Sequence, residues 1–448
     1  MTMSRIIVIG AGAGGMMAAG RAAELGVPVL LLEKNARPGK KILISGKARC
    51  NLTNTKELDD FIAMYGPNGR FLYRAFSRYF RDDLLTFLRR YGVAAKTEGD
   101  GRVFPASDDA RDVLRALERY MADHRVQLRT RSTVDAIEAN SGKVTGVQVG
   151  QERITAAAVI LATGGASHPE TGSSGDGYRL AAALGHTITR LRPALVPLAV
   201  EGIEQAMSMQ GVSLRHVRLT AYRCPASQID PSLTPTSDWG RGLGSGRPSW
   251  PIIESRMGDM IVTHFGISGP ITLLMSLAIV DALEHGPVSV SIDLKPTLDN
   301  KQLLQQLQWV FDRYGKRSYH VILKELLPHK LINPFVAITG IPPEKRGNEI
   351  TAEERERLCG SLKSLRFDIA GPLSMSDAMV TAGGVSLKEI DPHTMSSRLV
   401  GGLYFCGEVM DLDADTGGYN LQAAFSTGYI AGEQAALRVV KENTVGRQ

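Results

Sequence analysis

The clearest pattern of hydrophobic and polar positions lies in the first 33 residues. Ile6 to Ile9 form a short β-branched run, which is typical of a strand buried on both faces. A glycine-rich turn follows, then an alanine-rich helix that ends at Gly26, and then an apolar run from Val27 to Leu32 that closes on Glu33. This order predicts a βαβ unit with parallel strands.

The turn fits the spacing G-x-G-x-x-G through Gly10, Gly12 and Gly15. The first glycine permits the tight bend, the second lets a pyrophosphate approach the backbone, and the third lets the helix pack close to the strand. Glu33 stands where a carboxylate accepts hydrogen bonds from a ribose. We therefore predict a dinucleotide site. A secretory signal is the rival interpretation of this terminus, but the glycines are poor for a helical signal core and leave Glu33 unexplained.

The next 160 residues alternate between helical and strand patterns. Residues 34–54 are polar without an amphipathic period, which predicts a loop that contacts a ligand. We expect helices over 70–92 and 108–124, a hairpin over 96–104, and strands over 126–137, 144–149 and 156–162.

The pattern changes near Pro193. Short alternating segments and many prolines from there to about 294 predict a small antiparallel β domain, with an exposed loop over 225–256. Residues 298–363 have helical periodicity, and 367–381 return as strand. A last strand over 403–406 precedes a closing amphipathic helix that reaches about Lys441.

Composition narrows the protein class. The chain has 448 residues, a net charge of +6 and pI near 9.1, but its charges are interspersed, so we favour a mildly basic surface over a nucleic-acid partner. Its four cysteines form no C-x-x-C pair, so we predict neither a redox dithiol nor a metal site. The apolar run 271–280 is too short to span a bilayer, and we expect a cytoplasmic protein.

Two more glycine sites follow strands. Thr163-Gly164-Gly165 ends the strand over 156–162, although such glycines often only make turns. Gly407-Glu408 closes the last strand, and Thr416 to Asn420 reads TGGYN just before the closing helix. Glycines at a helix N-terminus form a pocket of N–H groups that attracts anions, so we favour a ligand role here over an ordinary loop.

With these sites in view, the chain resembles the bacterial FAD-dependent flavoproteins described as aminoacetone oxidase-like or as NAD(P)/FAD-dependent oxidoreductases. The resemblance spans nearly the whole chain. Its blocks are GAGAGG (10–15), GKKILISGKARCNLTN (39–54), LATGGASHPETGSSGDGYRLAAALGH (161–186), VTHFGISGP (262–270), TAGGVSLKEID (381–391) and LYFCGEVMDLDADTGGYNLQAAFSTG (403–428). Two departures are Lys47-Ala48, where the family loop usually has glycines, and Cys406, where a small residue is usual.

The resemblance implies an α/β fold with an FAD-binding Rossmann-like domain of the two-dinucleotide-binding type. This domain would be built from 1–192 and 382–448. A β-barrel-like insert would occupy 193–296 and 364–381, and a helical insert 297–363.

The resemblance also implies the cofactor contacts. Glycines of the first turn would hold the pyrophosphate, residues 41–51 would lie along the ribityl chain and isoalloxazine, and the helix starting near Asn420 would face the flavin N1–C2=O edge. Val134 would lie beside the adenine, although a plain core role for this valine is an equal alternative. The expected cofactor-binding residues are Gly10, Gly12, Gly14, Gly15, Glu33, Lys34, Lys41, Ser45, Arg49, Cys50, Asn51, Val134, Thr163, Gly164, Gly407, Glu408, Gly417, Gly418, Tyr419, Asn420 and Leu421.

Candidate acids and bases are few. His264 is the first candidate, because histidine side chains in general suit proton transfer near neutral pH, and Tyr419 is the second. A packing histidine and an aromatic packed on the flavin are the plainer interpretations. Cys50 has no nearby cysteine partner, so we do not expect a redox thiol.

The resulting hypothesis is an FAD-dependent oxidoreductase that moves a hydride between flavin N5 and a small or medium organic substrate. NAD(P)H or O₂ would turn the flavin over, and NAD(P)H would bind transiently because no second complete βαβ fingerprint is present. The resemblance leaves both aminoacetone oxidation and reduction of conjugated double bonds in keto-steroid-like bile acids open. The alternative is an FAD protein that acts on or with RNA, as tRNA-modifying flavoproteins do, or a regulatory flavoprotein. The sequence reveals neither the substrate nor the oligomeric state.

Overall fold

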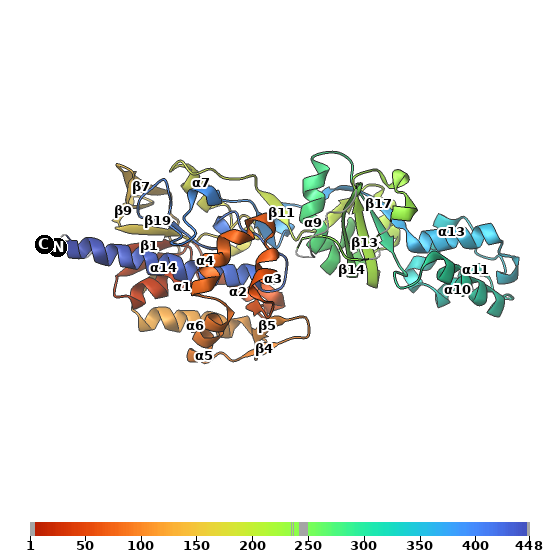
Figure 1. Cartoon of the computed structure of the whole chain (residues 1–448), viewed down its shortest axis with the longest axis horizontal. Helices are drawn as coiled ribbons and strands as arrows, with labels where there is room; N and C mark the ends of the chain where they lie inside the picture. The colour runs from red at the N-terminus through yellow and green to blue at the C-terminus, as the bar shows by residue number, and fades with distance from the viewer. Residues whose placement is uncertain (1–4, 234, 236, 242–249, 446–448) are drawn as a thin grey trace. The chain divides into compact units, whose positions relative to one another are not determined.

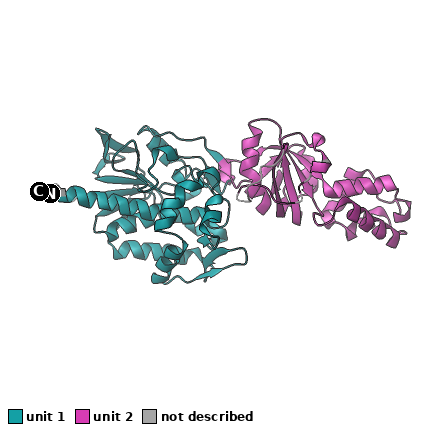
Figure 2. Cartoon of the chain, viewed as in Figure 1, with its two compact units in different colours: residues 1–192, 378–448 teal, residues 193–377 magenta. Residues whose placement is uncertain are grey.

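A computed structural model of the chain describes residues 5–233, 235, 237–241 and 250–445. The chain divides into two compact units, shown in different colours in Figure 2. Unit 1 consists of residues 1–192 and 378–448, and unit 2 of residues 193–377. The sequence predicted 192 and 382 as the boundaries of the discontinuous domain.

Unit 1 is built on a five-stranded parallel sheet of order β19-β10-β1-β2-β6. The strands are β1 Ile6–Ile9, β2 Val29–Leu32, β6 Gln127–Arg129, β10 Ala158–Leu161 and β19 Leu403–Phe405. β1 lies centrally because Ile6 pairs with Val29 on one side and Ala158 on the other. All residues of β1, β2, β10 and β19 are buried, as apolar strands that are covered on both faces require.

The two ends of the chain meet on this sheet. Helix α1 (Ala13–Glu24) packs against the closing helix α14 (Tyr419–Val445), and Figure 1 shows them side by side. Glycines let the backbones touch: a Cβ on Gly428 would lie 2.3 Å from the carbonyl oxygen of Gly14, and one on Gly432 would lie 2.3 Å from that of Ala18. This close approach ties the C-terminal helix into the N-terminal βαβ unit.

Smaller elements of unit 1 follow the predicted order. β4 (Ala95–Thr97) and β5 (Arg102–Pro105) confirm the hairpin, and β3 (Thr53–Asn54) extends it. Helix α6 (Ala110–Asp123) is capped by Asp109, whose side chain accepts a hydrogen bond from the Arg111 N–H at 2.9 Å. Further elements of unit 1 are α3 Leu58–Ala63, α7 Asp176–Ala182, β18 Val380–Ala382 and the antiparallel sheet β7 Ala136–Asn140, β8 Lys143–Val149 and β9 Glu152–Thr155.

Two predicted elements of unit 1 are wrong in extent. The single helix over 70–92 is a 3₁₀ segment η1 (Gly66–Leu72) followed by α4 (Tyr73–Arg78) and α5 (Arg81–Arg90). The break occurs because Phe80 is extended and its N–H donates to Asp83 Oδ2 at 2.9 Å, which starts α5 afresh. The strand over 126–137 is only β6, after which the chain leaves the sheet and forms β7.

Unit 2 contains a closed barrel of order β12-β15-β14-β13-β16-β17. Its elements are β12 Leu198–Val200, α8 Ile203–Ser208, β13 Ser213–Tyr222, β14 Ile252–Val262, β15 Gly266–Ser268, α9 Pro270–Leu283, β16 Ser289–Asp293 and β17 Leu365–Pro372. The predicted loop over 225–256 is wrong at its end, since β14 begins at Ile252 and pairs with Tyr222 of β13. Residues 234, 236 and 242–249 of that loop lie outside the described residues.

The helical part of unit 2 shares a hydrophobic core with the barrel. Leu307 and Phe311 of the first helix are buried in the same cluster as barrel residues Ile292 and Leu365. The helices are α10 Asn300–Arg313, α11 Tyr319–Ile322, α12 Ile332–Thr339 and α13 Ala352–Lys363. The predicted fold class is therefore confirmed: a Rossmann-type α/β domain with a barrel and a helical region.

A buried histidine gives unit 1 a predictable pH dependence. The His186 side chain has no exposed surface and contacts Glu389 Oε2 at 3.1 Å and Ser397 Oγ at 2.9 Å. Burial lowers the pKa of His186 more than Glu389 raises it. The unfolded chain therefore takes up a proton near pH 6.5 that the folded chain does not accept until lower pH.

We accordingly expect the free energy of unfolding to fall below pH 6.5, by at most about 1.4 kcal/mol per pH unit. Denaturant unfolding at pH 7.5, 6.5 and 5.5 measures this slope. His186→Gln should flatten it, whereas His285→Gln, at an exposed position, should not. Equal slopes for wild type and His186→Gln would contradict the assignment.

Candidate cofactor site

The three glycine sites meet at one edge of the sheet of unit 1. The carboxyl ends of β1, β10 and β19 lie next to one another, because the strands are parallel neighbours. The Ala162 N–H donates to Ile9 O at 2.9 Å, and the Cys406 N–H donates to Leu161 O at 3.1 Å. The strand order also reverses at β1, because β2 lies on one side of it and the later strand β10 on the other. Open α/β sheets bind ligands at such a reversal.

The three glycines of the G-x-G-x-x-G turn are needed for different structural reasons. Gly10 has φ of +99°, and a Cβ on Gly15 would lie 1.9 Å from the Gly10 carbonyl oxygen, so the turn itself needs both. Gly12 has φ of −84°, and no atom lies within 4 Å of a Cβ placed on it. Nothing in the described protein requires glycine at this position. A ligand that approaches the backbone at the start of α1 does require it, so the turn fits the FAD pyrophosphate.

Gly14 has a different environment from the other glycines of the turn. A Cβ there would lie 3.0 Å from Ala424 O and 3.3 Å from Cys406 Sγ. The residue therefore lies in the contact between α1 and α14, and its described neighbours explain its identity without a ligand.

Glu33 is buried at the end of β2 and is fixed on the glycine turn. Its Oε2 accepts from the Ala11 N–H at 2.9 Å, and its Oε1 accepts from the N–H and the side-chain amide of Asn35, both at 2.8 Å. A carboxylate can accept about four hydrogen bonds, so one further donor such as a ribose hydroxyl can be accommodated.

A chain segment after β10 is tied to the loop that follows Glu33. The Asn35 side chain donates to Thr171 O at 3.0 Å, and the Lys34 ammonium pairs with Asp176 Oδ2 at 2.6 Å and contacts Ser174. Lys34 was predicted to contact the cofactor; the structure places it on Asp176. Asn35 and Asp176 were not predicted from the sequence, although Asp176 lies in the family block 161–186.

Glu408 joins four separate segments beside the sheet edge. Its Oε2 accepts from Lys41 Nζ at 2.7 Å, and its Oε1 accepts from the Thr381 N–H at 2.9 Å and Ser167 Oγ at 3.2 Å. Lys41 also donates to Ser167 Oγ at 2.9 Å. Lys41 and Glu408, predicted separately, are thus one unit, and Ser167 and Thr381 are the members that sequence reasoning missed.

The segment over 39–54 is not the irregular loop that was predicted. It begins with a helical turn of α2 (Lys40–Ala48) after Gly39, and then three successive residues, Gly46, Lys47 and Ala48, have φ of +56°, +59° and +65°. Lys47 and Ala48 therefore have a left-handed backbone, a conformation that glycine adopts without strain. This conformation costs a residue with a Cβ about 1 kcal/mol or more.

Ala48→Gly should consequently raise the free energy of unfolding by about 0.5 to 1 kcal/mol, because glycine adopts this φ without strain, although it gains some entropy in the unfolded chain. Denaturant unfolding of the FAD-free protein measures the change. Ala139→Gly is the matched control, at an exposed position inside strand β7, and should be destabilised instead. A loss of stability in Ala48→Gly would show that the left-handed backbone carries no strain.

Asn51 connects this segment to the TGGYN site. Its side-chain oxygen accepts from the Gly418 N–H at 2.9 Å while its nitrogen donates to Thr53 O at 3.1 Å. A Cβ on Gly418 would lie 2.4 Å from Thr53 O. The segment after α2 and the start of α14 therefore lie in contact, as residues on a shared ligand must.

The neighbours of Asn51 are turned elsewhere. Arg49 pairs with Glu98 at 2.6 Å and stacks 4.1 Å over the Phe104 ring, so its guanidinium faces the hairpin. The Ser45 hydroxyl donates to Ile42 O at 2.7 Å. Cys50 is fully buried, and burial raises the pKa of its thiol to about 12, so a reactive thiolate is disfavoured.

The start of α14 is held rigidly. The Asn420 side chain accepts from the Ala414 N–H and donates to the Ala414 carbonyl, both at 2.9 Å, which closes the preceding loop. Tyr419 is buried with its ring 4.7 Å from the Phe61 ring, and burial raises the pKa of its hydroxyl. This placement favours packing over proton transfer for Tyr419. Leu421 follows it and is partly buried.

The remaining predicted residues are scattered. Thr163 Oγ1 is buried without a hydrogen-bond partner among the described residues, next to Gly164 with φ of +75°. Val134 is buried in the core of unit 1. His264 lies in unit 2, in an exposed turn between β14 and β15, and its catalytic role stays a prediction. Gly407, with φ of +73°, begins the turn that carries Glu408, and Gly417 has φ of +137°.

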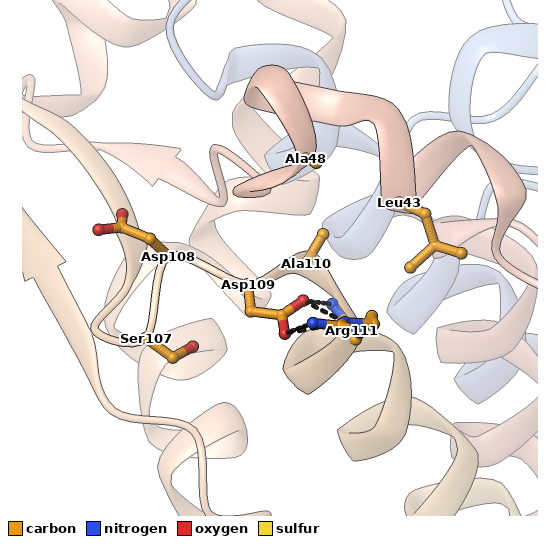
Figure 3. A pocket seen from close by; sticks show the side chains of 7 residues that line it. All are labelled: Leu43, Ala48, Ser107, Asp108, Asp109, Ala110 and Arg111. Carbon is orange, nitrogen blue, oxygen red and sulfur yellow. Dashed lines mark hydrogen bonds and ion pairs between the residues drawn. The ribbon is translucent and has the colours of Figure 1, made fainter.

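A cavity of about 530 Å³ borders the segment of α2 (Figure 3). Figure 3 shows Asp109 and Arg111 paired at its base and Leu43 and Ala48 opposite them. Its remaining lining residues are Ser107, Asp108 and Ala110. Since none of the three glycine sites lines it, this cavity is distinct from the sheet edge described above.

The described residues contain no group of three or more His, Cys, Asp or Glu side chains that could hold a metal ion. None of their helices combines the length and apolarity needed to cross a membrane. Cys406 is buried, and burial raises the pKa of its thiol to about 12, which agrees with a packing residue.

The chain resembles characterised proteins over most of its length. The 3-dehydro-bile acid delta(4,6)-reductase of Clostridium scindens is 31% identical over 439 residues, which cover 97% of this chain and all of that protein. The ribosomal RNA dihydrouridine synthase of Escherichia coli is 29% identical over 429 residues, which cover 94% of this chain and 96% of that protein.

Fold comparison gives a consistent result. The crystal structure of 3-ketosteroid delta1-dehydrogenase from Sterolibacterium denitrificans matches with a TM-score of 0.51 and 14% identity, over 98% of this chain and 100% of that one. At this identity the match shows the fold alone. The family model described as HI0933-like protein Rossmann domain matches residues 4–434. The chain therefore belongs to the HI0933-like family and is an FAD-dependent oxidoreductase.

Proposed function

We propose that this protein reduces a carbon–carbon double bond conjugated with a carbonyl group, with NAD(P)H as electron donor. The observation that supports the cofactor site is that no described part of the protein requires glycine at position 12. The names of two relatives suggest this reaction. The substrate of the bile acid reductase would be a 3-oxo-4,6-diene and that of the dihydrouridine synthase a uracil ring, and each has an alkene conjugated with a carbonyl.

When bound, FAD would supply the two-electron chemistry by exchanging a hydride at N5. The protein's part is to hold and polarise the cofactor. The N–H groups at the start of α1 would hold the pyrophosphate, and Glu33 would fix the ribose. Lys41, fixed by Glu408 and Ser167, would place a positive charge beside the same edge. The N–H groups at the start of α14 would stabilise negative charge on a group held there.

The favoured substrate is a small or medium organic molecule of the steroid-acid kind, since the 31% identical relative reduces a bile acid. The second candidate is uracil within RNA. Two observations favour it: the relatives from Escherichia coli and Haemophilus influenzae are ribosomal RNA dihydrouridine synthases, each 29% identical to this chain, and the net charge is positive.

The test is an anaerobic flavin titration. Purified protein should contain FAD, and NADH or NADPH should bleach it. A 3-oxo-4-ene steroid acid, or a uridine-containing ribosomal RNA fragment, should then restore the colour and gain two hydrogen atoms by mass. Bleaching by an amino-ketone and by neither nicotinamide would replace this proposal with an oxidase. A protein that takes up no FAD would refute both.

A further inference from the structure

The net positive charge of the protein comes entirely from unit 1. Unit 2 contains 19 Lys and Arg and 19 Asp and Glu residues, so it is neutral, whereas unit 1 contains 33 and 27. Within unit 1, residues 61–81 contain four arginines and no carboxylate side chain. This stretch, which includes η1 and α4, is therefore the place to look for an anionic partner.

Three of these arginines share one helical face. Arg70, Arg74 and Arg78 are spaced by four residues across η1 and α4, and all three are exposed, as is Tyr73 between them, at 39% of its surface. We call these four residues the arginine face. Neither the Arg70 nor the Arg74 guanidinium has a hydrogen-bond or ion-pair partner among the described residues.

The charge of this face is only partly compensated by the protein. Arg78 pairs with Glu433 at 2.8 Å, and the Tyr73 hydroxyl donates to Asp59 at 2.7 Å. Like charges four residues apart repel each other on a helix, so the row of arginines works against the stability of α4. An anionic ligand would relieve this repulsion, and a row of arginines flanking an aromatic ring suits a polynucleotide.

The arginine face is joined directly to the flavin end of the site. The Tyr65 hydroxyl donates to Tyr419 O at 2.6 Å, and the Asn68 side chain donates to Asp411 O at 2.8 Å. Arg81, which follows α4, donates to Asn54 O at 3.4 Å and Lys56 O at 3.1 Å. The segment that carries the arginines thus contacts both the loop before α14 and the strand after Asn51.

We propose that the arginine face binds the phosphate backbone of an RNA whose uracil reaches the neighbouring flavin site. This inference rests on the RNA form of the proposed function. Phosphate contacts would position the strand, and Tyr73 offers a ring on which an unpaired base can stack.

The experiment measures binding of a fluorescein-labelled, single-stranded 20-nucleotide uridine-rich RNA to the FAD-loaded full chain by anisotropy, at several KCl concentrations. We expect Arg70→Ala/Arg74→Ala to weaken binding at about 50 mM salt by at least about tenfold, and to reduce the slope of log K against log[salt] by about 1.4, since each lost phosphate contact on a single strand is worth about 0.7. Arg115→Ala/Arg153→Ala, which removes two other exposed arginines of unit 1, should change neither quantity.

Two results would overturn the proposal: a wild-type protein that does not bind the RNA, or a double variant with unchanged affinity and salt slope. A double variant that binds RNA normally but raises KM for the steroid acid would assign the face to a small anionic substrate instead. Flavin content and anaerobic bleaching of the same samples are measured separately. Loss of flavin in the wild type would refute the proposed function, while RNA binding would still report on the arginine face.

Discussion

Replacing Gly12 with alanine should leave the protein folded and weaken FAD binding by about 10- to 100-fold. The backbone at Gly12 suits any residue, and a Cβ there meets no protein atom within 4 Å. The methyl group would instead occupy the space through which a pyrophosphate approaches the start of α1. Overpacking of this kind costs about 1 to 3 kcal/mol, and each 1.4 kcal/mol is a factor of ten in affinity.

Gly15→Ala is the contrasting variant at the third fingerprint position. Its Cβ would lie 1.9 Å from the Gly10 carbonyl oxygen, so the turn must open and the folded state itself is destabilised. Flavin fluorescence titration and thermal unfolding of the FAD-free protein separate the two effects. If Gly12→Ala bound FAD as tightly as wild type, the pyrophosphate would not lie at this turn.

The sequence predicted the strands, turns and helix starts at this end of the sheet well because their signals are local. The βαβ unit, the glycines after β10 and β19, and the start of α14 within one residue all follow from short stretches of chain. Each is set by backbone requirements that neighbouring residues impose, such as the φ of +99° at Gly10.

The partners of charged side chains were not predictable in this way. Lys34 and Lys41 read equally well as ligands for an anion, but each finds a carboxylate far along the chain, in Asp176 and Glu408. The sequence shows that a lysine is near the site without showing which anion it faces. The start of β14 was missed for another reason, because the glycine- and proline-rich stretch before Ile252 outweighs the short alternation that follows it.

Gly14 shows the same limit for backbone contacts. Its place in the glycine turn suggested a ligand, yet the structure puts it against α14, whose residues lie more than 400 positions away in sequence. The alanine- and glycine-rich face of α14 is the only trace of this contact in the sequence, and small residues on a helix do not reveal their partner.

That contact makes Gly428→Ala a strongly destabilising substitution. Its Cβ would lie 2.3 Å from the Gly14 carbonyl oxygen and 2.9 Å from the Gly14 Cα, so two backbones must separate. Overpacking against backbone belongs at the upper end of its range, about 3 kcal/mol, whereas the better helix propensity of alanine returns at most about 1 kcal/mol. We expect a net loss of about 2 kcal/mol or more in denaturant unfolding of unit 1.

Gly360→Ala is the matched control, because Gly360 also lies inside a helix, α13, and a Cβ there meets nothing within 4 Å. Helix propensity alone should stabilise that variant by about 0.5 to 1 kcal/mol. The opposite signs of the two changes isolate the contact between α1 and α14 from helix propensity. Since both helices begin at the cofactor edge, Gly428→Ala should also weaken FAD binding. A Gly428→Ala protein as stable as the wild type would mean that the two helices do not touch through Gly14, and that the C-terminal helix is held to the sheet by other contacts.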